Sequence, residues 1–181
     1  TQNGIKPTQN GIMKSRINGE DLNEMLLEAE YPDWFKDPEA TVLERTFSAD
    51  IFLGKGYYKE TYFEGVHIGY GNLELSKNTI LNFESEFETV EMHFTLNGHV
   101  VTDSEYFKDS ISFSPGSHNV FYTNGFKGTT NWSSRYPLRM FEINMTPGFV
   151  EKYIPEGHQL FDAFRKAMEN QQSAMLSKHN Y

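Results

Sequence analysis

The sequence predicts a mainly β protein, an antiparallel barrel or sandwich, with a helical segment towards its C-terminus. Short β-like runs recur at intervals of roughly ten residues, with turn-forming residues between them. Aromatic residues are abundant, with 15 Phe and 10 Tyr, and such side chains pack well on pleated surfaces. After Pro147 the apolar residues change from strand spacing to helical spacing.

The N-terminal residues contain a repeat that we place outside the fold. Thr-Gln-Asn-Gly-Ile occurs at 1–5 and again at 8–12, and Met13 follows directly. The simplest account is an appended leader before a natural start at Met13, and the alternative is a mobile native tail. We therefore expect residues 1–19 to be a disordered leader.

Residues 20–30 favour a helix, because they are rich in helix formers and carry acidic residues in the first turn. Pro32 would end that helix. From Val42 onwards the pattern is instead typical of strands separated by Gly, Asn and Pro. We predict strands at 42–47, 50–53, 57–63, 66–75, 79–83, 90–96, 99–103, 111–114, 119–123 and 138–145.

The run from Val90 to Asn124 is the most informative part of the chain. Its even-numbered apolar residues, from Val90 to Leu96, alternate with polar ones, as in a half-buried strand. Asn97-Gly98 then suits a tight hairpin turn. In the preceding run the apolar residues Leu81, Phe83 and Phe87 are odd-numbered, so we expect a bulge or bend near Glu88-Thr89.

Three segments resemble the regulatory half of AraC/XylS-type bacterial transcription regulators. They are Phe94-Thr95-Leu96-Asn97-Gly98, then Pro115-Gly116-Ser117-His118 leading to Phe121-Tyr122, and the last strand with the helices after it. The resemblance covers about residues 40 to 175. It implies a cupin-like jelly-roll barrel that binds a small-molecule effector, a following helix that forms a homodimer, and a separate helix-turn-helix domain that reads DNA.

With this resemblance the chain divides into a leader (1–19), a jelly-roll sensor domain (20–147), a helical dimerisation segment (148–174) and the start of a linker (175–181). We expect the helix to begin near Gly157 and to run for about 14 to 17 residues. Its apolar residues must be covered by a partner's helix or by its own barrel. They are Leu160, Phe161, Phe164 and Met168.

Candidate ligand-binding residues come from strands that carry polar and apolar side chains. Glu142 lies in the middle of a predicted strand and is costly to bury without a partner, which a ligand could be; an exposed position is the alternative. Met140 shares its face. Tyr70, His118 and Tyr122 combine an apolar body with a polar tip, which suits small-molecule pockets.

The sequence gives no positive sign of catalysis. Among His93, His99 and His118, at most two positions match the ligand pattern of metal-binding cupins, so we expect no metal and no other cofactor. The acidic ladder at 84, 86 and 88 is interpreted as a solvated strand face. A metal-dependent cupin enzyme (isomerase or dioxygenase) and a carbohydrate-binding β-sandwich stay open as alternatives.

Net charge and amino-acid composition narrow the range of partners that this chain could bind. The net charge of −9 and the lack of clustered Lys and Arg argue against DNA binding by this chain itself. The sequence contains no cysteine, which excludes disulfides and fits a cytoplasmic protein. No apolar run approaches the length that spans a membrane, so we expect no membrane partner.

Overall fold

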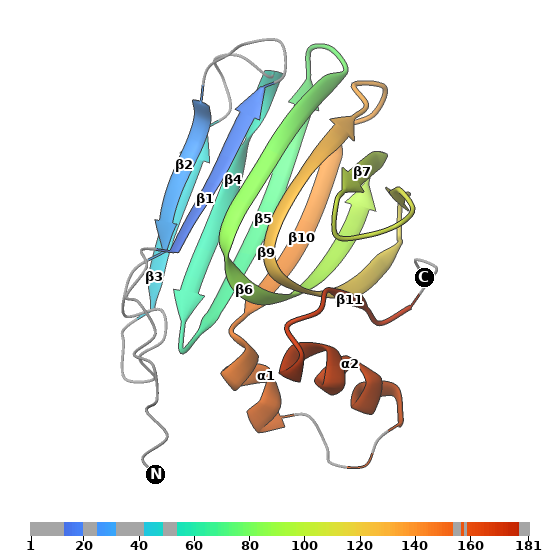
Figure 1. Cartoon of the computed structure of the whole chain (residues 1–181). Coiled ribbons are helices and arrows are strands. Elements are labelled where there is room, and N and C mark those ends of the chain that lie inside the picture. The colour runs from blue at the N-terminus through green and yellow to red at the C-terminus, as the bar shows by residue number, and fades with distance from the viewer. Residues whose placement is uncertain are drawn as a thin grey trace.

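The computed structural model describes residues 13–19, 25–31, 42–48, 54–153, 157 and 159–177. Its chain is built almost entirely of antiparallel strands, with two helices near the C-terminal end (Figure 1). The elements are β1 (Met13–Gly19), β2 (Met25–Tyr31), β3 (Leu43–Ser48), β4 (Gly54–Phe63), β5 (Val66–Leu75), β6 (Thr79–Asn97), β7 (Val100–Ser104), β8 (Ile111–Phe113), β9 (His118–Trp132), β10 (Leu138–Met145), α1 (Pro147–Tyr153), α2 (Gln159–Glu169) and β11 (Ala174–Met175).

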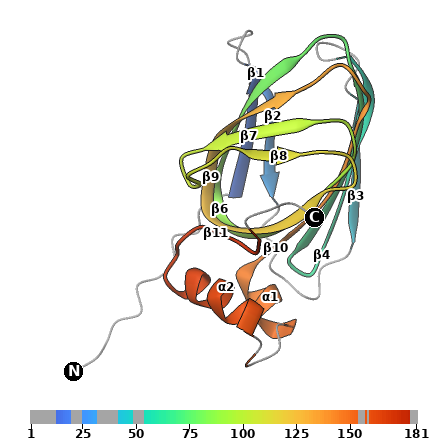
Figure 2. The same ribbon diagram turned by 90° about the vertical axis from the view of Figure 1, so that its right-hand side faces the viewer.

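The strands form a jelly-roll barrel with two walls. The two longest strands, β6 and β9, take part in both walls. The hydrogen-bonded order is β3-β4-β5-β10-β6-β9-β7-β8. In addition, β1 pairs with β6, β2 pairs with β1, and β11 pairs with β9. The first half of β6 pairs with β1, whereas its second half pairs with β10. Figure 2 shows the strands curving round to enclose an interior, with both helices outside it.

The predicted bulge is confirmed, but the reason that we gave for it is wrong. The pairing of β6 with β9 shifts register between Ser85 and Glu88, opposite Gly125, whose φ is +83°. We had assumed that the odd-numbered and even-numbered apolar residues of β6 share one face. Instead Leu81 packs in the interior, whereas Val90 packs on the outer side among residues of the two helices.

Two predictions for the N-terminal region are corrected. Residues 13–19, assigned to a disordered leader, form a strand that pairs with both β2 and β6. Residues 25–31, expected to be helical, form β2. Backbone pairing with a neighbouring strand outweighs helix propensities of a few tenths of a kcal/mol per residue. The predicted strand at 50–53 lies outside the described residues.

Elsewhere most of the predicted strands are confirmed, but several of their boundaries differ from the prediction. The predicted strands at 79–83 and 90–96 are one continuous strand, β6, and 119–123 is the first part of the longer β9. The expected helix is shorter than predicted, and α1 precedes it. β11 pairs with β9, so Met175, which we placed in a linker, belongs to the sheet. None of the helices among the described residues is long and apolar enough to cross a membrane.

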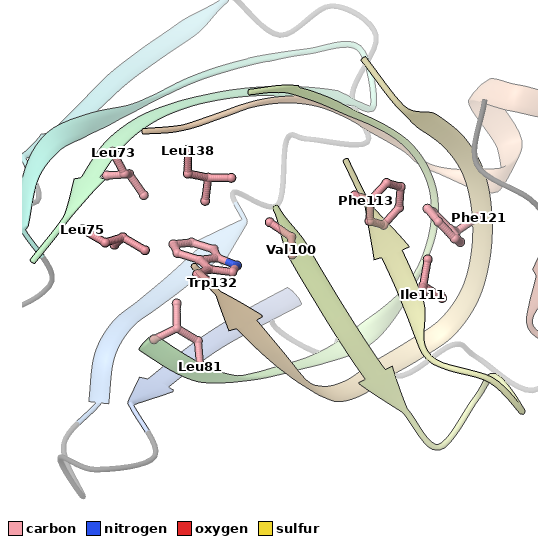
Figure 3. Close-up of a cluster of buried hydrophobic side chains, with 9 residues drawn as sticks. All are labelled: Leu73, Leu75, Leu81, Val100, Ile111, Phe113, Phe121, Trp132 and Leu138. Carbon is pink, nitrogen blue, oxygen red and sulfur yellow. The ribbon is translucent and has the colours of Figure 1, made fainter. Parts of the chain in front are cut away.

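Two apolar clusters hold the fold together, one inside the barrel and one outside. The inner cluster fills one part of the interior around Trp132, as Figure 3 shows. It consists of Leu73, Leu75, Leu81, Val100, Ile111, Phe113, Phe121, Trp132 and Leu138. Burying each such side chain stabilises the fold by about 1.5–3 kcal/mol.

The outer cluster lies between the barrel wall and α2. Phe164 and Met168 are 3% and 4% exposed and pack with Val90, Tyr122 and Met145. Two of the four residues predicted to dimerise are therefore covered by their own barrel, which was the alternative. Phe161 is half-buried, and the side chain of Leu160 lies outside the described part of the structure.

Candidate functional site

The candidate site is a cavity of about 370 Å³ inside the barrel. Strand alternation produces it, because successive side chains point to opposite faces of the wall. Its apolar part is lined by the inner cluster, including Leu81 and Trp132. Its polar part is lined by inward-facing residues of β4, β5, β6 and β10, which form three groups of side chains.

The first group is centred on the buried carboxylate of Glu60. Its Oε1 lies 2.7 Å from Nε of Arg45, and its Oε2 lies 3.3 Å from Nε2 of His67. The hydroxyl of Tyr62 donates to Oε2 at 2.8 Å. Burial by itself raises the pKa of Glu60, but the hydrogen bonds from His67 and Tyr62 and the nearby positive charges outweigh it and lower the pKa. Glu60 is therefore a stably ionised group.

The second group is Tyr58 and Glu142. The Tyr58 hydroxyl donates to Oε1 of Glu142 at 2.6 Å. Gly69, which lies opposite Glu142 in the pairing of β5 with β10, makes room for this contact. A Cβ at Gly69 would lie 2.2 Å from the Tyr58 hydroxyl and 2.8 Å from Oε1 of Glu142. The glycine is thus required by close approach of these side chains.

The third group follows β6. Nδ1 of His93 lies 3.1 Å from Oε1 of Glu91, and its Nε2 lies 3.3 Å from the hydroxyl of the fully buried Thr95. The imidazole also packs against the ring of Phe113, with centroids 4.4 Å apart. Burial lowers the pKa of His93, but the hydrogen bond and charge of Glu91, with the charge of Glu142, raise it overall.

The second and third groups face one another. His93 and Glu142 are direct partners in the pairing of β6 with β10. Burial raises the pKa of Glu142, and the negative charge of Glu91 raises it further. Ligand atoms of Glu91, His93 and Glu142 all lie within 4.8 Å of one another, so these three residues could hold a metal ion.

The five predicted ligand-binding residues do not form one site. Met140 and Glu142 line the cavity. Tyr70, on the other face of β5, packs against Tyr57 with ring centroids 6.0 Å apart. The exposed His118 stacks on Phe94.

Tyr122 is buried on the outer side of the barrel, not in the cavity. Its ring meets Phe164 of α2 edge-on, and its hydroxyl donates to Glu88. An apolar body with a polar tip thus suits an interface between sheet and helix as well as a ligand pocket. Within the acidic ladder Glu86 is exposed, but Glu88 is half-buried by this contact, so the prediction of a solvated face is wrong for Glu88.

Sequence reasoning missed Tyr58, Glu60, His67 and Glu91. Tyr58, Glu60 and Tyr62 alternate along one face of β4, and His67, Gly69 and Gly71 alternate along β5. The signal available in the sequence was a row of polar residues at alternate positions of one strand, followed by a histidine and two glycines at alternate positions of the next. Of the three histidines tested as metal ligands, only His93 lies in the cavity.

Comparisons with known proteins find distant structural likenesses. Neither a family model nor a curated protein matches the sequence. Among solved structures, a cupin protein from Bacteroides fragilis is 17% identical with a TM-score of 0.37, and the alignment covers 54% of this chain and 75% of that one. The AraC-like transcriptional activator CuxR is 11% identical with a TM-score of 0.40, over 75% of this chain and 46% of that one.

A vicilin from Solanum melongena is 10% identical with a TM-score of 0.34, over 70% of this chain and 41% of that one. Likenesses this distant carry no argument about function. The assignment of a cupin-like jelly roll rests on the order and pairing of the chain's own strands.

Proposed function

We propose that this chain is a small-molecule-sensing domain whose ligand binds in the barrel cavity, and that it serves a regulator of the AraC type. The cavity carries the proposal. Its volume of about 370 Å³ is within the range of small-molecule sites, roughly 300–1,000 Å³. An apolar part and a few convergent polar groups are the usual composition of such sites.

The barrel wall connects the cavity mechanically to α2. On β6 and β9, Thr89 and Thr123 line the cavity, while the next residues along, Val90 and Tyr122, pack in the outer cluster with Phe164. Because close-packed interiors deform little, a ligand that moves the inner side of this wall also displaces its outer side. The helices would respond to the occupancy of the cavity.

A binding role in the cavity is favoured over a carbohydrate-binding surface. A carbohydrate-binding surface needs exposed aromatic side chains gathered on one face. Trp132 is 6% exposed within the inner cluster, and the exposed tyrosines among the described residues lie on separate elements and connections, at positions 57, 106, 136 and 153. A metal-dependent enzyme stays the second candidate, because carboxylates, imidazoles and a phenol are groups that general acid–base catalysis uses. DNA contact by such a regulator would be made outside this chain, because the net charge of −9 disfavours it here. The homodimer also stays a prediction.

Thermal-shift screening of metabolites tests the proposal, because ligand binding to the native state raises Tm. We expect a stabilising metabolite whose effect is reduced in Tyr58→Phe, which removes a hydroxyl from the cavity. Tyr70→Phe is the matched control, since it removes the same atom from the outer face of the adjacent strand. A metabolite that stabilises wild type and Tyr58→Phe equally would place the ligand elsewhere and contradict the proposal.

A further inference from the structure

We propose that Glu91, His93 and Glu142 bind a divalent transition-metal ion inside the barrel. This inference does not depend on the proposed sensing role, because a metal can occupy the site whether or not the cavity also takes an organic effector. We therefore set aside our sequence-based expectation of no metal. That expectation considered histidines in two motif segments, and Glu142 lies on β10, outside both.

The three side chains converge because of strand register. His93 and Glu142 are opposite each other on β6 and β10, and Glu91 is two residues before His93 on the same face of β6. Their ligand atoms lie within 4.8 Å of one another. Metal–ligand bonds of about 2.0–2.2 Å join atoms up to about 4.4 Å apart, so small side-chain rotations complete the site.

The charges of the cavity favour a cation at this place. Glu91 and Glu142 bring carboxylate oxygens within 4.8 Å of each other in the cavity, where two negative charges repel. Arg45 lies against Glu60 at 2.7 Å and is engaged there. Neither Lys nor Arg occurs among the described residues that line the cavity. His93 would bind the ion as the neutral imidazole and would release any proton that it carries. A divalent ion would replace the repulsion with attraction to both carboxylates.

Neighbouring groups already orient the proposed ligands. The Tyr58 hydroxyl holds one oxygen of Glu142 at 2.6 Å and leaves the other available. The Thr95 hydroxyl can accept a hydrogen bond from Nε2 of His93 at 3.3 Å, which leaves Nδ1 facing Glu91. Such outer partners fix the tautomer and the direction of metal ligands.

The donor set indicates which ions fit. One imidazole nitrogen with two carboxylates suits Zn²⁺, Mn²⁺, Fe²⁺ or Co²⁺ better than a soft ion that prefers sulfur. Three protein ligands leave at least one coordination position for water or for a ligand atom. The three residues would thus form an open site that can present a metal to a bound small molecule.

Titration calorimetry of the chelator-stripped full chain with Zn²⁺ and with Mn²⁺ tests the inference, with the visible spectrum of added Co²⁺ as a second readout. We expect one ion per chain and a higher Tm with metal. Glu142→Gln and His93→Gln should each weaken binding at least tenfold. Glu142→Gln should also fold without metal at least as stably as wild type, because it removes one of two repelling charges.

Glu86→Gln and His118→Gln are the matched controls, since both residues are exposed and outside the cavity. No binding to the stripped chain, or binding that survives unchanged in both cavity variants, would overturn the inference. Metabolite screening of the metal-free protein tests the sensing role separately from the metal site. A metabolite that depends on Tyr58 while no metal binds would leave the sensing role standing and remove the metal site.

Discussion

The two faces of the wall formed by β6, β9 and β10 show how one set of strands serves two purposes. The outer face carries Val90, Tyr122 and Met145, which are buried against α2. The inner face, one residue along each strand, carries Glu91, Thr123 and Asn144 and lines the cavity. The usual arrangement, with apolar side chains inside and polar ones outside, is therefore reversed along this part of the barrel.

The reversal separates stability from function. Phe164 and Met168 bring apolar surface to the outside of the wall, so its apolar residues are covered without filling the interior. The interior can then hold ionisable groups that a stability argument alone would exclude. We expect changes on the outer face to cost stability and changes on the polar part of the inner face to affect binding more than stability.

The largest effect is expected at the outer face. Phe164→Ala should lower the free energy of unfolding by about 3–5 kcal/mol, because it removes a buried ring and leaves a cavity against Tyr122. Urea denaturation measures it. Tyr136→Ala, at a residue that is 53% exposed, is the control and should change the free energy by about 0.5 kcal/mol or less. A loss below about 1 kcal/mol at Phe164 would mean that α2 is not held by this contact.

The face of each strand that lies inside the barrel could not be predicted from the sequence. The alternation from Val90 to Leu96 correctly predicted a strand, and the turn residues around it placed most of the neighbouring strands. Alternation defines two faces but does not say which one is inside. That choice depends on α2 returning to cover the wall, through contacts such as that of Phe164 with Tyr122, which lie far apart in the sequence.

The residues of the candidate site could likewise be predicted only in part from the sequence. Glu142 could be singled out because a carboxylate in the middle of a strand needs a partner, and it lines the cavity. Glu60 could not be connected to Arg45 or His67, because these residues meet only through the pairing of three strands. Tyr122 has the chemistry of a pocket residue, but the register of β9 directs it outwards to the helix.

A smaller effect is expected at the ion pair inside the barrel. Glu60→Gln should cost about 1.5–3 kcal/mol, the range for hydrogen bonds to a charged group. The value should stay below that of a fully buried pair, because the side chain of Arg45 is 34% exposed and water can replace its partner.

The same substitution has a pH signature. The pKa of Glu60 is lowered in the folded protein, so its contribution is fully present above the unfolded pKa, about 4.3, and is lost as the pH falls through the folded pKa. Urea denaturation between neutral and acid pH should give a smaller difference between wild type and Glu60→Gln at the acid end. An equal difference at every pH would mean that Glu60 is not held ionised by His67, Tyr62 and Arg45.

The smallest effect on stability, and the sharpest separation of the two faces, is expected at Gly69. Gly69→Ala places a methyl group 2.2 Å from the Tyr58 hydroxyl, so Tyr58 and Glu142 must move apart. The cost should be only about 1 kcal/mol, at the low end for added bulk in a core, because the atoms that must move belong to side chains and not to the backbone. Ligand and metal binding should nevertheless fall strongly, since Glu142 loses its orientation. Gly148→Ala is the matched control: nothing lies within 4 Å of the added Cβ, and the residue is in α1 outside the barrel. It should leave both binding and stability almost unchanged. If Gly69→Ala lowers stability as much as Phe164→Ala, the polar interior contributes to the fold as the outer cluster does, and the separation of stability from function is wrong.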